Sequence, residues 1–153
     1  MKLSDYVMEF LAQKEVKMIF MLPGGGCMHL VDSLGRNKAL DYVACLHEQA
    51  AAIAAESYAQ YTNELGAVLV TTGPGGTNTI TGLAAAWIDS TPVLFISGQV
   101  KRSDRMGDSG VRQMGSQEVE IVPIVRSVTK YAETVMNPER IRYMLEKAYY
   151  MAM

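Results

Sequence analysis

The sequence lacks the features that mark membrane-spanning, secreted and metal-binding proteins. Its 153 residues include two cysteines, Cys27 and Cys45, whose spacing favours free thiols in a reducing cytoplasm over a disulfide. No apolar run reaches the ~18 residues of a membrane span, and no charged-then-apolar leader precedes the first helix-like segment. No cluster of histidine, cysteine and carboxylate residues has the spacing of a metal site. We therefore expect a cytoplasmic protein with no metal site and no membrane contact in this chain.

An excess of charge of one sign is missing as well. Lysine and arginine total 14, aspartate and glutamate total 16, and like charges form no runs. This balance excludes the basic footprint that binds nucleic acid and the polybasic patch that binds a membrane surface. Hydrophobic residues, by contrast, make up 49% of the chain, which is enough for one buried core at this length.

Helix-like and strand-like patterns alternate along the chain, which is typical of an α/β fold. Strands are expected at residues 17–22, 41–46, 66–71, 92–97 and Thr129–Val135. Helices are expected from Ser4 as a cap, at 28–34, at 47–61, at 77–88, and from Asn137 onward. Because continuous apolar strands alternate with helices, we predict a parallel β-sheet flanked by helices on both faces, formed by residues 1–153 as one domain. The last helix is still running at Met153, so we expect the chain to be part of a longer protein.

Three loops at the carboxyl ends of the expected strands hold the most unusual residues. Ligands of open parallel sheets bind outside those ends. The loops are Pro23–Gly26, Leu46–Glu48 and Thr71–Gly76. A fourth stretch, 98–117, is polar and longer than an ordinary connection, which is typical of a functional loop.

Glu48 has two interpretations. It stands where a strand meets the helix HEQAAAIAAESYA (residues 47–59), and a helix that is apolar all round is a buried one. The carboxylate could simply satisfy the free amides of the helix N-terminus. Alternatively, it is a buried carboxyl whose apolar neighbours disfavour its charged form, so that it keeps a proton available. The residues alone leave both open.

The glycine-rich turn in VLVTTGPGGTNTITGLAAAW (residues 68–87) is not a known nucleotide loop. It contains no lysine, which excludes a P-loop, and it lacks GxGxxG spacing. Its glycines, Gly73, Gly75 and Gly76, would let the backbone approach a flat ligand closely. A tight strand-to-helix connection without a ligand is the alternative.

Five blocks, in order and in spacing, resemble the amino-terminal domain of acetolactate synthases. They are PGGG, HEQAAAIAAESYA, TTGPGGTNTITGLAAAW, PVLFISGQV and GSQEVEIVPIVRSVTKYA, and together they cover essentially the whole chain. The same pattern runs through related thiamine-diphosphate enzymes such as pyruvate oxidases and benzoylformate decarboxylases. The resemblance implies a domain that binds the aminopyrimidine half of thiamine diphosphate, in an enzyme that decarboxylates and carboligates pyruvate or another small 2-keto acid.

The resemblance also implies roles for single residues. Glu48 would share a proton with the pyrimidine ring nitrogen and thereby activate the thiazolium carbon of the cofactor. Gln117 would lie near the reacting centre. The implied cofactor-binding residues are Pro23, Gly24, Gly25, Glu48, Thr71, Pro74 and Asn78.

The rest of the active site is implied to lie outside this chain. In the family, magnesium and the diphosphate bind to a later domain, and FAD binds to a middle domain in many acetolactate synthases. A homodimer or tetramer through the Glu48 helix and the Thr77–Trp87 helix is implied, and the 153 residues alone should be inactive. Gly26, where alanine is usual, and Ser116, where phenylalanine is usual, leave open a related decarboxylase or oxidase. A non-catalytic α/β binding module is the other alternative.

Overall fold

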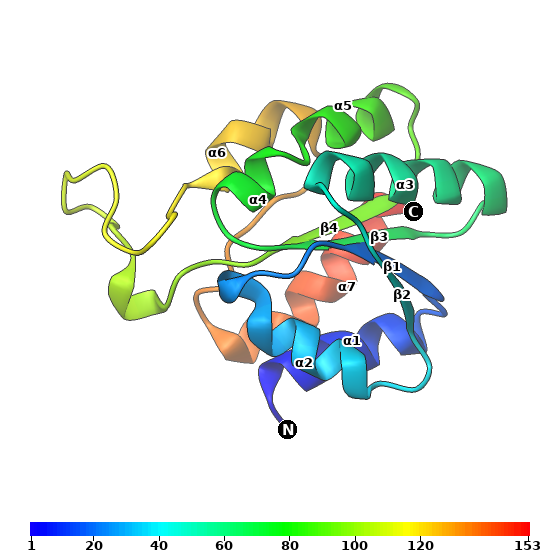
Figure 1. The fold of residues 1–153 in the computed structure, drawn as a ribbon, viewed down its shortest axis with the longest axis horizontal. Coiled ribbons are helices and arrows are strands. Elements are labelled where there is room, and N and C mark those ends of the chain that lie inside the picture. Colours follow the sequence, from blue (N-terminus) through cyan, green and yellow to red (C-terminus); the bar gives the residue numbers. More distant parts are fainter.

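Four short parallel strands form the central sheet, in the order β2-β1-β3-β4 (Figure 1). The structure is a computed structural model that describes residues 1–153. The strands are β1 (Met18–Met21), β2 (Asp41–Ala44), β3 (Gly66–Val70) and β4 (Val93–Ser97). From β1 the chain moves to β2 on one side and then crosses back to β3 on the other, so the strand order reverses between β1 and β3. The predicted parallel sheet is confirmed.

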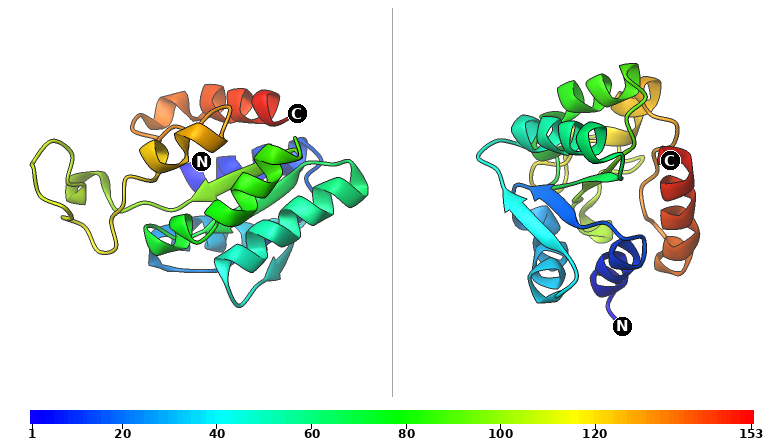
Figure 2. Two further views of the ribbon diagram at one scale, coloured as in Figure 1. Left: turned by 90° about the horizontal axis from the view of Figure 1, so that it is seen from above. Right: turned by 90° about the vertical axis from the view of Figure 1, so that its right-hand side faces the viewer.

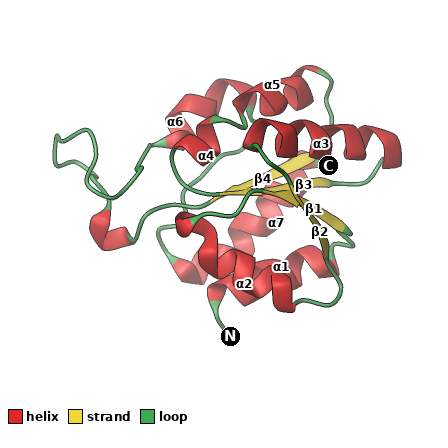
Figure 3. Ribbon diagram, viewed as in Figure 1, coloured by secondary structure: helices red, strands yellow, loops and turns green.

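Helices cover both faces of this sheet (Figure 3). They are α1 (Leu3–Gln13), α2 (Met28–Arg36), α3 (Glu48–Thr62), α4 (Pro74–Thr77), α5 (Ile80–Ile88), α6 (Ile121–Val125) and α7 (Ile141–Ala152). One layer holds α1, α2 and α7, and the opposite layer holds α3 to α6 (Figure 2). No helix combines the length and the apolar character that crossing a membrane requires.

The core is divided between the two faces by the alternation of side chains along the strands. Ile19 of β1 and Leu69 of β3 pack in the larger cluster with residues of α1 and α7. Val68 and Val70 point the other way and pack against Ala51 and Ala55 of α3. Strand β3 is buried at all five positions, as the apolar run predicts. Strand β2, in contrast, is exposed along its whole length because it is the edge strand and pairs only with β1.

The strand predicted at Thr129–Val135 is wrong. This segment makes no backbone hydrogen bond to β4, and residues of both line an apolar cavity of about 900 Å³. Tyr131 ties the segment to α7 instead, since the Lys147 ammonium lies 4.6 Å from its ring centre. The Tyr131 hydroxyl also donates a hydrogen bond to Glu133 of the same segment. Contact with α7 therefore replaces pairing with the edge of β4.

The cap predicted at Ser4 is also wrong. Helix α1 begins at Leu3, with Lys2 as its N-cap, so Ser4 lies inside the first turn. There its hydroxyl accepts a hydrogen bond from Ser33 Oγ at 2.9 Å, which links α1 to α2. Near the other end of the chain, Asn137 does act as a cap, because its side chain accepts a hydrogen bond from the Glu139 amide at 2.9 Å. It caps the 3₁₀ turn Pro138–Arg140, which leads into α7.

The helix predicted at 77–88 is interrupted. Helix α4 ends at Thr77 and α5 begins at Ile80. Between them the Thr79 hydroxyl donates to the Gly76 carbonyl at 2.7 Å, and the Thr79 amide bonds the same carbonyl at 3.1 Å. A threonine side chain that competes for a backbone carbonyl in this way disrupts a regular helix.

Small residues allow α3 and α5 to pack closely. A Cβ atom at Gly82 of α5 would lie 2.6 Å from Ala52 Cβ and 3.0 Å from the Ile53 amide nitrogen. Both neighbours belong to α3, and the second is rigid backbone. Glycine is therefore required at position 82 for the observed separation of the two helices.

We expect Gly82→Ala to lower the free energy of unfolding by about 1–3 kcal/mol, because the added methyl group overpacks the interface. Gly35→Ala in α2 is the matched control, since nothing lies within 4 Å of a Cβ at that position. The control should leave stability unchanged or raise it by about 0.5–1 kcal/mol. Chemical denaturation measures both, and equal effects would contradict the close packing of α3 on α5.

Candidate functional site

The loops after β1 and β3 meet at the carboxyl ends of the strands, and Thr71 lies between them. The Gly26 amide donates a hydrogen bond to Thr71 Oγ1 at 3.0 Å. A Cβ at Gly24 would lie 2.5 Å from Thr71 Cβ, and a Cβ at Gly75 would lie 2.7 Å from Thr71 Cγ2. The two glycines thus allow both loops to contact one threonine side chain. This is also the point where the strand order reverses, where ligands of such sheets bind.

Glu48 is the first residue of α3, and its side chain faces the glycine-rich turn. The residue is only 9% exposed. Asn78 Nδ2 donates a hydrogen bond to Glu48 Oε2 at 2.9 Å. No protein group donates to the other oxygen, Oε1, which would lie 3.6 Å from a Cβ at Gly75. A buried carboxyl with one oxygen held and the other open can bind a further hydrogen-bonding group.

His47, rather than Glu48, caps the N-terminus of α3. His47 is the N-cap, and its Nδ1 accepts a hydrogen bond from the Gln49 amide at 3.1 Å. The Glu48 carboxyl bonds only Asn78, from the segment after α4. The interpretation of Glu48 as a simple helix cap is therefore wrong.

Pro74 and Asn78 flank α4 and complete this cluster. Pro74 is the first residue of α4, where a missing amide costs nothing. The Asn78 amide donates to the Pro74 carbonyl at 2.9 Å, so the short helix fixes the position from which the Asn78 side chain reaches Glu48. The structure thus brings together four of the predicted site residues: Glu48, Thr71, Pro74 and Asn78.

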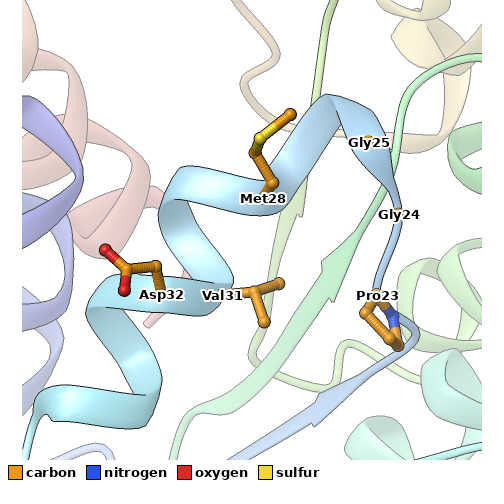
Figure 4. A pocket seen from close by; sticks show the side chains of 6 residues that line it. All are labelled: Pro23, Gly24, Gly25, Met28, Val31 and Asp32. Carbon is orange, nitrogen blue, oxygen red and sulfur yellow. The ribbon is translucent and has the colours of Figure 1, made fainter.

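Pro23, Gly24 and Gly25 line a separate, open hollow of about 490 Å³ (Figure 4). The other lining residues are Met28, Val31 and Asp32 of α2. The Asp32 carboxylate is already paired with Arg36 at 2.6 Å and with Lys2 at 3.4 Å. Among the predicted residues, Gly24 alone connects this hollow to the Glu48 cluster, through its contact with Thr71.

Gln117 is brought to the glycine-rich turn by its backbone. Its carbonyl group occupies the place that a Cβ of Gly73 would take. Gly73 and Gln117 both have a φ near +59°, a left-handed conformation that glycine adopts freely and other residues rarely adopt. The Gln117 side chain is exposed and makes no hydrogen bond within the chain.

One buried acid near Gln117 was missed in the sequence. Glu118 is 4% exposed and accepts hydrogen bonds from the amides of Met106, Met114 and Gly115. Burial raises the pKa of Glu118, but these amides and the charge of Arg105 outweigh burial and hold the pKa below its usual range. A glutamate in a polar loop has no sequence signal that would have identified it.

Other polar residues lie away from the Glu48 cluster. Arg105 pairs with Glu120 at 2.5 Å, and Arg102 donates to the Met136 carbonyl at 3.1 Å. Cys27 and Cys45 are free thiols, and burial raises the pKa of both, which disfavours the reactive thiolate. No group of three or more histidine, cysteine, aspartate and glutamate side chains is placed to hold a metal ion.

The fold is that of an α/β domain with a parallel sheet, and the candidate site lies at the switch point of that sheet. Residues 1–124 match the family described as thiamine pyrophosphate enzyme, N-terminal TPP binding domain, and the chain belongs to this family.

The chain is also similar to acetolactate synthases, among them three from different organisms. It is 40% identical over 149 residues to the acetolactate synthase isozyme 3 large subunit of Escherichia coli (strain K12), an alignment that covers 97% of this chain and 25% of that protein. It is 37% identical over 152 residues to the chloroplastic acetolactate synthase of Arabidopsis thaliana (97% and 21%). It is 35% identical over 149 residues to the acetolactate synthase large subunit of Lactococcus lactis subsp. lactis (strain IL1403) (97% and 25%). The chain therefore spans about a quarter of the length of these relatives.

Thr72 gives a physical reason for a glycine at position 26. A Cβ at Gly26 would lie 3.0 Å from both Cβ and Cγ2 of Thr72. Thr72 cannot turn away freely, because its hydroxyl donates to Gln99 Oε1 at 2.9 Å. A side chain at position 26 would therefore collide with Thr72 as it is placed here.

We expect Gly26→Ala to lower the free energy of unfolding by about 1–2 kcal/mol through this contact. In a Thr72→Ser background, which removes only Cγ2, the same change should cost less, giving a measurable coupling energy in a double-mutant cycle. Gly25→Ala is the control, since no atom lies within 4 Å of a Cβ there. Identical costs for Gly26→Ala in both backgrounds would refute the collision with Thr72.

Proposed function

We propose that this chain forms the aminopyrimidine-binding half of a thiamine-diphosphate site, in an enzyme of acetolactate synthase type. Such an enzyme decarboxylates pyruvate or a related 2-keto acid and joins the product to a second one. The observation that carries the proposal is the buried Glu48 carboxyl, with one oxygen held by Asn78 and the other open. The family and the acetolactate synthase relatives support the cofactor and the type of reaction.

The residues around Glu48 fit a flat heterocycle. Gly75 has no side chain, so the backbone of the glycine-rich turn can lie directly beside a ring that contacts Glu48 Oε1. When bound, thiamine diphosphate supplies the carbanion chemistry. Glu48 would hold a proton at Oε1 toward the ring nitrogen, and Asn78 would orient the carboxyl. Ala51 and Ala52, in the next turn of α3, are both fully buried, so α3 enters the apolar interior directly after Glu48.

The other parts of the site are proposed to lie outside these 153 residues. Magnesium and the diphosphate would bind to another domain, and FAD, where the enzyme uses it, to a third. Pro23, Gly24 and Gly25 would contact the cofactor from the side of the open hollow. Gln117 would lie near the reacting centre, at the glycine-rich turn where its backbone already lies.

A second candidate is a decarboxylase or oxidase that uses the same cofactor on a different 2-keto acid. Gly26 and the exposed Ser116 favour it, because both positions differ from the acetolactate synthase pattern. A screen of 2-keto acids on the complete enzyme separates the two reactions.

We expect Glu48→Gln in the complete enzyme to abolish turnover, because an amide cannot share a proton with the ring nitrogen. Exchange of the thiazolium proton of the cofactor with D₂O should slow by about 10² or more. Circular dichroism of the 153-residue variant should match the unchanged chain.

Glu56→Gln is the matched control for this variant. Glu56 is the other buried glutamate of α3, and its carboxylate bonds Gln60 at 2.5 Å, so the change should leave proton exchange unaltered. Full turnover in Glu48→Gln would overturn the proposed role and would favour a non-catalytic binding module.

We also propose that the chain forms a homodimer, or a tetramer, through α3 and the α4–α5 segment. These helices lie side by side (Figure 2). They expose large apolar side chains to solvent. Ile53 and Trp87 are nearly half exposed, and Ile88 is 77% exposed. Apolar surface shared by adjacent helices is a common basis of protein association.

Light scattering at tens of micromolar should show a dimer or tetramer of the 153-residue chain. Trp87→Glu should shift it toward monomer, because a charge would be buried in the apolar interface. Tyr150→Glu, on α7 of the opposite layer, should leave the oligomeric state unchanged, although Tyr150 is also aromatic and is 79% exposed. A clean monomer of the unchanged chain would count against this interface.

A further inference from the structure

The carboxylate of Glu118 closes the long loop of residues 98–117. The loop projects beyond the end of the sheet (Figure 2) and contains a single 3₁₀ turn, Arg102–Asp104. The Met106 amide bonds the two Glu118 oxygens at 2.8 and 3.0 Å. The Met114 and Gly115 amides both bond Oε2 at 3.1 Å. One carboxylate thereby joins the outgoing and the returning arm of the loop.

The two arms also touch at Gly115. A Cβ there would lie 2.7 Å from Val100 Cβ and 2.8 Å from the Asp104 carbonyl oxygen, so only glycine permits this approach. The Glu118 carboxylate also binds the Gly115 amide, so it contacts the same residue that touches Val100 and Asp104. The position of residues 115–118 is therefore determined from both sides.

Gln117 is held in a costly conformation next to this carboxylate. A left-handed backbone is unfavourable for a residue with a side chain, and it persists only where its surroundings enforce it. The Gln117 side chain has no hydrogen bond that would do so, and its carbonyl lies against Gly73. The charged contacts beside Gln117 are those of the neighbouring residue, Glu118, with its three loop amides.

We propose that Glu118 is a positioning residue, whose bonds to three loop amides hold Gln117 in its left-handed conformation against Gly73. The Gln117 side chain is thereby presented at the glycine-rich turn, with no need for contacts of its own. The conformational part of this proposal concerns only the present chain. Its consequence for catalysis rests on the proposed function, in which Gln117 acts near the reacting centre.

The test follows amide exchange and backbone contacts by NMR in the unchanged chain, Glu118→Gln and Glu120→Gln. In Glu118→Gln, the amides of Met106, Met114 and Gly115 should exchange about tenfold faster or more, because an amide side chain offers one acceptor in place of two charged oxygens. The nuclear Overhauser contacts between residues 117 and 73 should be lost. Glu120→Gln is the control, since Glu120 is also an acid of this segment but pairs with Arg105.

A rescue variant separates positioning from general support of the loop. Glycine adopts a left-handed backbone without strain, so adding Gln117→Gly to Glu118→Gln should restore the contacts to residue 73 while the three amides stay unprotected. Retained contacts in Glu118→Gln, or no recovery in the double variant, would overturn the proposal. So would unfolding of Glu118→Gln, because Glu118 would then serve global stability. No cofactor is present in these measurements, so they are independent of the outcome for Glu48.

Discussion

Close packing around the Thr71 side chain is the constraint on which the candidate site depends. Thr71 fills the space that Gly24 and Gly75 leave free, and its hydroxyl oxygen accepts a hydrogen bond from the Gly26 amide. The loops after β1 and β3 are thereby locked to one another, although residues 24 and 71 are far apart in the chain. Since Gly75 also borders Glu48, any shift of this contact would move the catalytic candidate as well.

Much of the fold could be predicted from local patterns. The four strands begin and end within two residues of their apolar runs, and Asn137 caps the 3₁₀ turn that leads into the last helix. The failures have non-local or competing causes. The run at Thr129–Val135 has strand character, but its placement depends on the contact between Tyr131 and Lys147 of α7. The break before α5 depends on the Thr79 hydroxyl, which a periodicity argument does not register.

The candidate site was predictable to the extent that its residues stand in recognisable motifs. Glu48 and Asn78 were both identified, and the crossover connections of a parallel sheet explain why residues 30 apart in sequence meet at 2.9 Å. Glu118 was not identified, because its donors include Met106, 12 residues away on an irregular loop. The sequence marks Gly26 as a departure from the acetolactate synthase pattern, but its contact with the methyl group of Thr72 is visible only in three dimensions.

The two edges of the sheet differ in a way that bears on how the chain behaves among other chains. The outer edge of β4 faces a cavity that residues 128–136 line on the far side, so this segment shields it. The outer edge of β2 is open to solvent, and an open edge is a template for pairing with a strand of another molecule. Two features limit such growth of the sheet: β2 is only four residues long, and it starts with the charged Asp41. A strand of a neighbouring molecule could therefore extend the sheet only at the β2 edge.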